Sequence, residues 1–229
     1  MKGIPDLPGL LRRGFFPAVS LARSRTARAQ RYVFWKKMSR KVQRVPCRLD
    51  AKSVKQLPIE ELRIILRGAD DIIGQGGRSL LSKILKGSRA QEVLNLHFDQ
   101  NPVYGYYRGA PEEEVLAKID RTILDGYLRI MYDYRLPLLA YTDAGWAIEK
   151  ETYAIELLQG FEELLTASQP PYDMGYLKDR SRALIWCLLD KVEASQNPQY
   201  LPLLKAWQET EWKKVRQRIQ QVMQKLGNL

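Results

Sequence analysis

The order of apolar patterns along residues 50–165 most constrains the fold of this chain. Three segments with apolar side chains at helical spacing come first, and two short alternating runs, 128–132 and 136–141, follow them. Asp133-Tyr134-Arg135 separates the alternating runs, which indicates a hairpin whose turn contains no glycine. A further helical pattern follows the hairpin. The order therefore predicts a small helical domain closed by a two-stranded sheet.

Capping and breaking residues give approximate bounds to the helices of this part. Ser88 and Thr142 are expected N-caps, Pro111 is expected to start a helix, and Gly87 and Gly126 to end one. The turn-rich residues 97–110 are expected to contain one short strand near Tyr104. The expected helices lie within 50–73, starting near 57–58, and at 78–86, 89–96, 111–125 and 142–165.

Everything after Pro170-Pro171 carries a helical pattern. Helices are expected over 177–194, from Leu201 onward and over 212–226. The last two are similar to a single HEAT-type helical pair, and a helical cap on a bundle fits the same pattern. The predicted organisation is thus a tail at 1–48, a domain at 50–168 and a helical C-terminal region at 172–229.

Positive charge is concentrated at the start of the chain. Residues 1–48 hold thirteen Lys/Arg and one acid, whereas residues 49–229 are close to neutral, at −1. For residues 1–37 three interpretations stay open: a disordered basic arm, an organelle transit peptide, and translation upstream of a true start at Met38. The last is favoured, because organised sequence begins soon after Met38. The net charge of +11 therefore describes mainly this tail.

Helices followed by a hairpin are the order of a winged helix, so the fold class is mainly α with a small β wing. Residues 78–149 also resemble the RecQ C-terminal (RQC) winged helix of RecQ-family DNA helicases. Residues 38–229 as a whole are similar to small stand-alone bacterial proteins with a minor form of that domain. Four segments carry the resemblance, in the family's order: Leu85-Lys86-Gly87-Ser88-Arg89-Ala90-Gln91, Tyr104-Gly105, Ile123-Leu124-Asp125-Gly126-Tyr127-Leu128 and Leu139-Ala140-Tyr141-Thr142-Asp143-Ala144-Gly145.

The resemblance implies DNA binding, in repair, replication or recombination, and does not imply ATP hydrolysis. The helicase motor and the four-cysteine zinc module that precede this domain in RecQ proteins have no counterpart in the sequence. The turn at 133–135 is short for a strand-separating wedge. We also find no GxSxG, HExxH or Walker A motif and no ligand cluster around His97, the one histidine. The sequence therefore predicts no enzyme activity, no cofactor and no metal.

The expected mode of binding is a clamp on the DNA backbone with little base specificity. Glu112, Glu113 and Glu114 begin the helix that enters the major groove in most winged helices, and their charge opposes phosphates there. Phosphate contacts are instead expected at the turn before residue 89, where a helix N-terminus attracts anions. The candidate DNA-binding residues are Lys86, Ser88, Arg89, Arg108, Arg129, Tyr134 and Arg135.

Each candidate also has a purely structural interpretation, as a helix cap, a solvated charge or a packed strand residue. The alternative function is a protein–protein adaptor, with a protein partner bound through residues 177–226. Two distant cysteines, Cys47 and Cys187, suit a reducing compartment, and no apolar run reaches the length of a membrane span. We expect a bacterial, nucleoid-associated protein of the cytoplasm that binds no membrane, while oligomeric state and the preferred nucleic-acid structure stay open.

Overall fold

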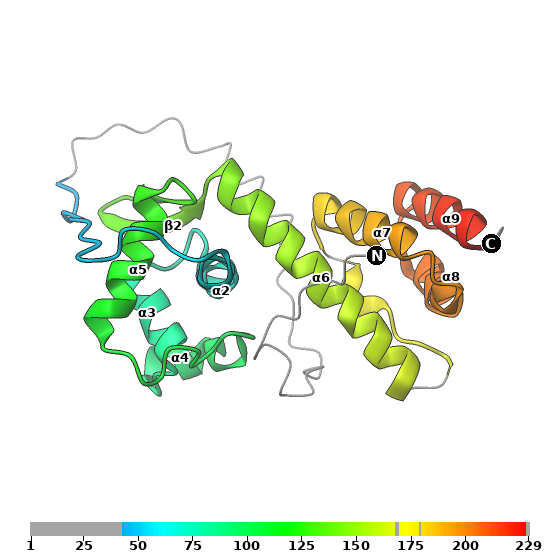
Figure 1. Cartoon of the computed structure of the whole chain (residues 1–229), viewed down its shortest axis with the longest axis horizontal. Helices are drawn as coiled ribbons and strands as arrows, with labels where there is room; N and C mark the ends of the chain where they lie inside the picture. Colours follow the sequence, from blue (N-terminus) through cyan, green and yellow to red (C-terminus); the bar gives the residue numbers. More distant parts are fainter. Residues whose placement is uncertain (1–42, 168–169, 179, 228–229) are drawn as a thin grey trace. The chain divides into compact units, whose positions relative to one another are not determined.

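The computed structural model describes residues 43–167, 170–178 and 180–227 (Figure 1). The expectations for residues 1–42, a start at Met38 included, lie outside these residues. Contacts divide the described chain into two compact units, residues 43–149 and 150–227, each with its own apolar core. The domain bounds expected from the sequence stay a prediction.

The first unit has the order that the apolar patterns predicted, three principal helices and then a hairpin. The mainly helical winged-helix fold is therefore confirmed. Its elements are α2 (Ile59–Ala69), η1 (Asp70–Ile72), α3 (Arg78–Lys86), α4 (Gln91–Asn95), η2 (Phe98–Gln100), α5 (Glu112–Leu124), β1 (Leu128–Asp133), β2 (Leu136–Tyr141) and the beginning of α6 (Asp143–Ala167).

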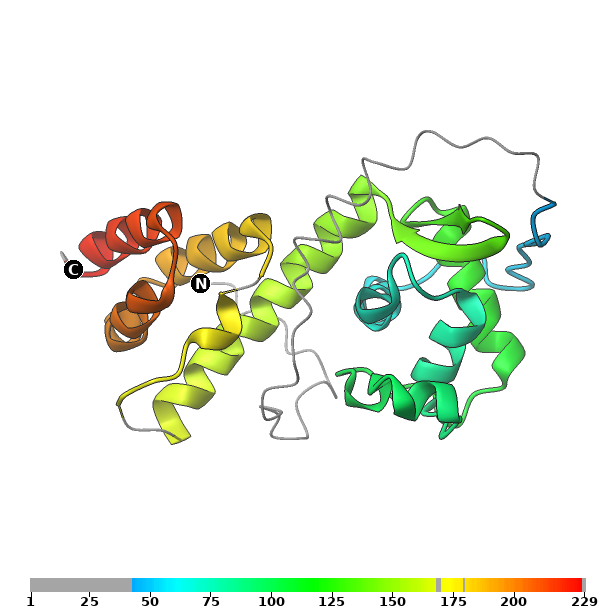
Figure 2. The ribbon, with the colours of Figure 1, turned by 180° about the vertical axis from the view of Figure 1, so that it is seen from behind.

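The core of this unit lies where α2, α3 and α5 meet. Each helix has one apolar face, and Leu66, Leu85 and Ile119 from the three faces are fully buried. Leu128 and Leu139 add the inward face of the hairpin to the same cluster. Seen from behind, the hairpin closes one end of the unit (Figure 2). Burial of these faces, rather than helix propensity, is what holds such short helices together.

The hairpin is antiparallel and its turn has two residues. Leu128 lies opposite Tyr141 and Asp133 opposite Leu136, which leaves Tyr134 and Arg135 as the turn. The other edge of β2 is also paired, because the amide of Leu139 donates to Gly76 O at 2.8 Å and Leu139 O accepts from the amide of Gly74 at 2.8 Å. Residues 74–76 therefore protect β2 from pairing with another chain.

The junction between β2 and α6 explains the glycine in the last of the four sequence segments. Thr142 is the predicted N-cap: its Oγ1 accepts a hydrogen bond from the amide of Gly145 at 3.1 Å. A Cβ on Gly145 would stand 2.0 Å from the carbonyl oxygen of Tyr127. Only glycine lets the start of α6 lie this close to the chain before β1.

Two local predictions in this unit were wrong. No strand forms near Tyr104, because residues 102–109 make successive turns, with the amide of Tyr104 bonded to Asn101 O and Gly105 at a positive φ. Ser88 does not cap a helix, since α4 begins two residues later than expected, at Gln91, with Ala90 as its N-cap residue. The Ser88 hydroxyl instead accepts a hydrogen bond from the amide of Ala90 at 3.3 Å.

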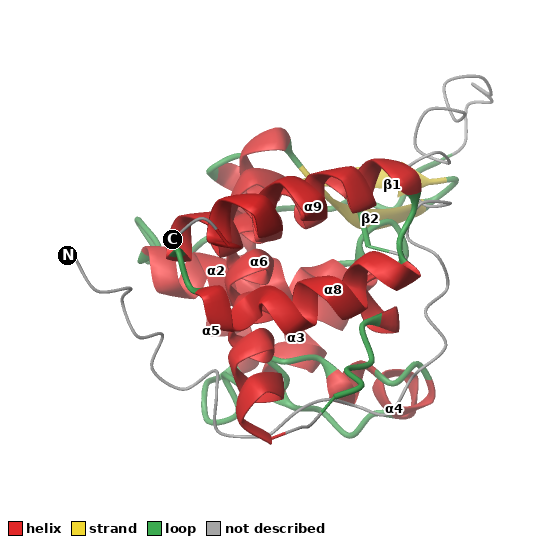
Figure 3. Ribbon diagram, turned by 90° about the vertical axis from the view of Figure 1, so that its right-hand side faces the viewer, coloured by secondary structure: helices red, strands yellow, loops and turns green. Residues whose placement is uncertain are grey.

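Every regular element in the described part of the second unit is helical, as predicted for the C-terminal region. This unit holds the rest of α6, η3 (Gly175–Leu177), α7 (Arg182–Ser195), η4 (Pro198–Tyr200), α8 (Leu201–Thr210) and α9 (Lys213–Gly227). Figure 3 shows α8 and α9 side by side. Their core includes Phe161, whose ring lies 5.9 Å from that of Trp207. The likeness to a HEAT pair stays a prediction.

The start of α7 differs from the expected one. Leu177 belongs to η3, and α7 begins only at Arg182, after Ser181, whose hydroxyl accepts from the amide of Leu184 at 3.3 Å. The periodic pattern could not separate the two elements, since the side chain of Leu177 is buried in the same core. Across the described residues, no helix is both long and apolar enough to cross a bilayer.

Candidate nucleic-acid interface

Two glycines bring two turns of the first unit into contact. Gly87 ends α3 in the left-handed conformation, at φ 70°, and Gly105 has φ 75°. A Cβ on Gly87 would lie only 2.9 Å from the Cα of Gly105. The amide of Gly105 donates to Ile84 O at 3.0 Å, and the hydroxyl of Tyr104 donates to Ser88 O at 2.9 Å. This contact explains why the sequence pairs a Lys-Gly-Ser turn with a Tyr-Gly turn.

Four of the predicted residues gather at these turns, and we call Lys86, Ser88, Arg89 and Arg108 the turn cluster. The Arg108 guanidinium lies across both glycines, because Nη2 would be 3.1 Å from a Cβ on Gly105 and 3.4 Å from one on Gly87. Arg89 and Arg108 are exposed and Lys86 is half-buried. The ion pairs among the described residues involve none of these three cations. The neighbouring Lys83, in contrast, is paired with Glu92 at 2.8 Å.

The charge of the turn cluster comes from side chains rather than from a helix end. Ser88 and Arg89 precede α4, which has only five residues. The predicted phosphate site on the N-terminus of a helix at 88–96 is therefore wrong in its geometry. The cations themselves are placed as a group, since the Gly87–Gly105 contact fixes the two turns that carry them.

The other three predicted residues lie on the wing, residues 128–141. Tyr134 stands in the turn with φ 53° and is 69% exposed, so its ring is open to solvent. Nε of Arg135 donates to Gln43 O at 3.1 Å, so this guanidinium is held against the chain that leads into the domain. Arg129 is exposed on β1, opposite Ala140.

The turn cluster and the wing are separate. Pro137 O would be 2.9 Å from a Cβ on Gly77, at the start of α3, whereas the turn cluster follows its end. Nine helical residues rise about 13 Å. Figure 1 likewise shows α4 and the hairpin at opposite ends of α3 and α5. The seven predicted residues thus form two groups and not one patch.

The helix α5, which would face the major groove, has acids at its start and cations that are already paired. Glu113 forms an ion pair with Lys52, which lowers the pKa of that carboxyl. Lys118 contacts Glu61 at 2.7 Å and Glu114 at 3.3 Å. Nε of Arg121 donates to Asp125 at 2.9 Å, and this hydrogen bond lowers the pKa of Asp125.

Sequence reasoning missed one arginine beside the wing, Arg44. Residues 43–48 were assigned to the basic tail, yet the amide of Val45 donates to Arg135 O at 3.0 Å and Val45 O accepts from the hydroxyl of Tyr132 at 3.1 Å. Arg44 lies 4.8 Å above the ring of Tyr132. No periodic pattern marks this segment, so only tertiary hydrogen bonds reveal where it lies.

The described ranges contain no cluster of side chains suited to binding a metal ion. No group of three or more His, Cys, Asp or Glu side chains there could hold a metal ion. His97 has a positive φ, 56°, at the residue before η2, which fits a local turn role. A left-handed residue of this kind is common for a polar side chain in a tight turn.

Comparison with known families supports the fold and the kind of ligand. The model of the RQC domain matches residues 59–162, from the first residue of α2 into α6. Comparisons with curated proteins and with solved structures gave no match. RQC domains are DNA-binding winged helices of RecQ helicases and are not catalytic, and residues 59–162 of this chain form an RQC domain.

Proposed function

We propose that the protein binds the DNA backbone through the turn cluster, with little base specificity. The observation that supports this most is the set of three cations, Lys86, Arg89 and Arg108, on the two turns that the Gly87–Gly105 contact joins. Among the described residues, none of the three forms an ion pair with a carboxylate. Lys and Arg that neutralise phosphates release counterions, which is the main source of sequence-independent affinity. Contacts of this class position a protein on DNA but do not read bases.

Groove reading by α5 fits the domain poorly. Glu112 and Glu113 are exposed at the start of the helix, and Lys118 and Arg121 are both engaged by carboxylates. A phosphate or a base edge would have to displace those ion pairs. The same argument favours recognition of DNA shape over a defined sequence.

The wing adds a preference for duplex ends or forks to the proposal. Tyr134 presents an exposed ring at the tip of the hairpin. Stacking of an end base on such a ring contributes roughly 1–3 kcal/mol in single-strand binders. A role in DNA repair, replication or recombination, near the nucleoid in the bacterial cytoplasm, belongs to the same proposal, and the two free thiols, Cys47 and Cys187, suit that compartment.

The test uses the full chain and a fluorescent forked duplex. Anisotropy titrations at several salt concentrations give the affinity and its salt slope. The variant Lys86→Ala/Arg89→Ala/Arg108→Ala should bind at least about tenfold more weakly, since each charged contact contributes more than about 1 kcal/mol. Its slope should fall by roughly 0.9 for each phosphate that the variant no longer neutralises, or about 3 for all three cations.

A matched control removes the same charge elsewhere. Lys55, Arg182 and Lys205 are exposed and lie outside both the turn cluster and the wing. Their triple alanine variant should keep most of the affinity and its slope. If both triple variants weakened binding equally, the proposed site would be refuted, because the affinity would then depend on the overall charge of the chain and not on the turn cluster.

The adaptor function has less support. In the described part of residues 177–226, Trp212 is the one large apolar side chain that is exposed. A protein partner through this region stays a proposal, tested by pull-down with the full chain under conditions where DNA is digested.

A further inference from the structure

The second unit leaves one tryptophan outside its core. Trp212, directly before α9, is 69% exposed, whereas Trp207 on α8 is fully buried and bonded through Nε1 to Glu211. The Nζ of Lys178 lies 5.5 Å from the centre of the Trp212 ring, so a cation from another segment already contacts this side chain. The Trp212 side chain therefore presents a flat apolar ring to solvent with a cation beside it.

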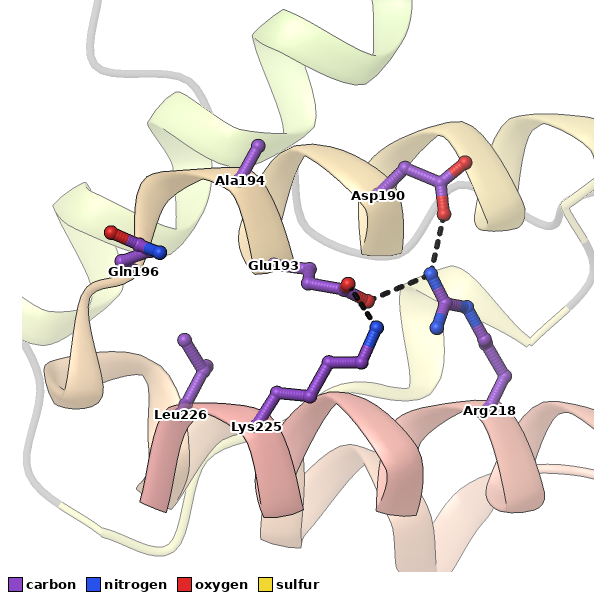
Figure 4. A pocket seen from close by; sticks show the side chains of 7 residues that line it. All are labelled: Asp190, Glu193, Ala194, Gln196, Arg218, Lys225 and Leu226. Carbon is purple, nitrogen blue, oxygen red and sulfur yellow. Dashed lines mark hydrogen bonds and ion pairs between the residues drawn. The ribbon is translucent and has the colours of Figure 1, made fainter. Parts of the chain in front are cut away.

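The helix that follows Trp212 has five cations and no acid. Two of these cations face α7: Arg218 contacts Asp190 at 2.6 Å and Glu193 at 3.0 Å, and Lys225 also pairs with Glu193. Figure 4 shows both side chains directed at these carboxylates. They serve the packing of α9 on α7 and leave little charge for a ligand.

The remaining three cations of α9, Lys213, Lys214 and Arg216, are exposed and take part in none of the ion pairs of the described residues. Lys213 and Arg216 lie about 60° from each other around the helix axis, and Arg216 lies beside the buried stripe that includes Val215 and Ile219. Lys214 lies about 160° from Arg216, on another face of the helix. The acid nearest in sequence does not neutralise them. Glu211 is buried and accepts from Nε1 of Trp207 at 3.0 Å and from the amide of Trp212 at 3.2 Å.

We propose that Lys178, Trp212, Lys213 and Arg216, the Trp212 patch, bind single-stranded nucleic acid. An exposed indole offers a face on which one base can stack, and cations around it attract the flanking phosphates. An acidic peptide would use the cations but not the flat ring. This inference does not rest on the turn cluster, because the Trp212 patch lies in the other unit and is made of different residues.

The test is made in the full chain that also carries Lys86→Ala, Arg89→Ala and Arg108→Ala, so failure of the turn cluster and failure of this patch are distinguishable. The probe is a fluorescent twelve-residue oligothymidine, titrated by anisotropy. In this background Trp212→Ala should weaken binding at least about fivefold, as for loss of one stacked base. Trp212→Phe should keep most of the affinity.

An abasic oligomer of the same length separates stacking from charge. Trp212→Ala should leave the affinity for the abasic oligomer unchanged. Lys213→Ala/Arg216→Ala should weaken binding of both oligomers and lower the salt slope by about 1.4, at roughly 0.7 for each phosphate on a single strand. Arg182→Ala/Lys205→Ala is the matched control and should change neither. Because these side chains are exposed, the variants should keep the circular dichroism of the parent.

Three results would overturn the proposal. If Trp212→Ala left the affinity for oligothymidine unchanged, no base would stack on the Trp212 ring. If a twelve-residue polyglutamate displaced the labelled oligomer as well as unlabelled oligothymidine does, the Trp212 patch would bind any polyanion and not nucleic acid in particular. Loss of binding to phosphatidylserine vesicles in these variants, with oligothymidine binding intact, would make the partner an anionic membrane surface.

Discussion

Replacing Gly87 by alanine tests whether the contact between the two turns is as tight as the structure has it. At φ 70° a side chain costs roughly 1–2 kcal/mol, and a Cβ there would also lie 2.9 Å from the Cα of Gly105. That neighbour is backbone, so it cannot turn aside as a side chain would. Overpacking of this kind adds about 1–3 kcal/mol. We expect Gly87→Ala to lower the free energy of unfolding of the first unit by about 2–5 kcal/mol.

Gly74 gives a control with the same backbone conformation. Its φ is also 70°, yet a Cβ there would meet nothing within 4 Å. The conformational cost and the entropy that alanine removes from the unfolded chain are common to both variants. Gly74→Ala should therefore show only the conformational cost, and the difference between the variants, about 1–3 kcal/mol, measures the contacts of the new Cβ with Gly105 and with the Arg108 guanidinium.

Urea unfolding followed by hydrogen-exchange mass spectrometry is the suitable assay. Peptides from residues 78–110 report the first unit without the second. The forked-duplex titration then shows whether Gly87→Ala weakens DNA binding when the protein is folded, as it should if the turn places Arg89 and Arg108. Equal destabilisation by Gly87→Ala and Gly74→Ala would refute the reasoning, since it would mean that the turns do not touch.

Two further predictions concern packing and thiol chemistry. Gly145→Ala should lower the free energy of unfolding by more than about 3 kcal/mol, because its Cβ would stand 2.0 Å from Tyr127 O. A Cβ on Gly109 would meet nothing within 4 Å, so Gly109→Ala should change it by no more than about 1 kcal/mol in the same urea assay. Similar values for the two variants would contradict the close approach of Gly145 to Tyr127. Burial raises the pKa of the Cys187 thiol to about 11, so at pH 8 roughly one in a thousand Cys187 thiols is ionised. In the native protein, Ellman's reagent should therefore react fast with Cys47, whereas Cys187 should react only after unfolding. Two equally fast thiols in the native protein would count against this prediction.

Much of the first unit could be predicted from the sequence. The bounds of α3, α5 and the hairpin follow from apolar spacing and from glycines such as Gly87 and Gly126, which have positive φ in the structure. These are local signals, so they hold whatever the rest of the chain does. The errors at Tyr104 and Ser88 come from the same stretch, where tertiary hydrogen bonds and not periodicity decide the backbone.

The candidate sites could be predicted only in part from the sequence. Residue type identified the cations of the turn cluster and of the wing, but not that they form two groups at the two ends of α3. It also gave no sign of Arg44 beside Tyr132 or of the exposed ring of Trp212. Which charges are neutralised depends on partners far away in the chain, such as Glu61 for Lys118.

Sequence patterns predicted a winged helix at residues that resemble the RQC domain, and placed acids at the start of its third principal helix. Apolar periodicity, turn residues and the four matching segments are all local in the chain, so they can be recognised without coordinates. Which cations form ion pairs, and how the remaining cations are grouped, follows from the tertiary structure. Ion pairs and close glycine contacts join residues that are distant in sequence, and their existence depends on how the helices pack.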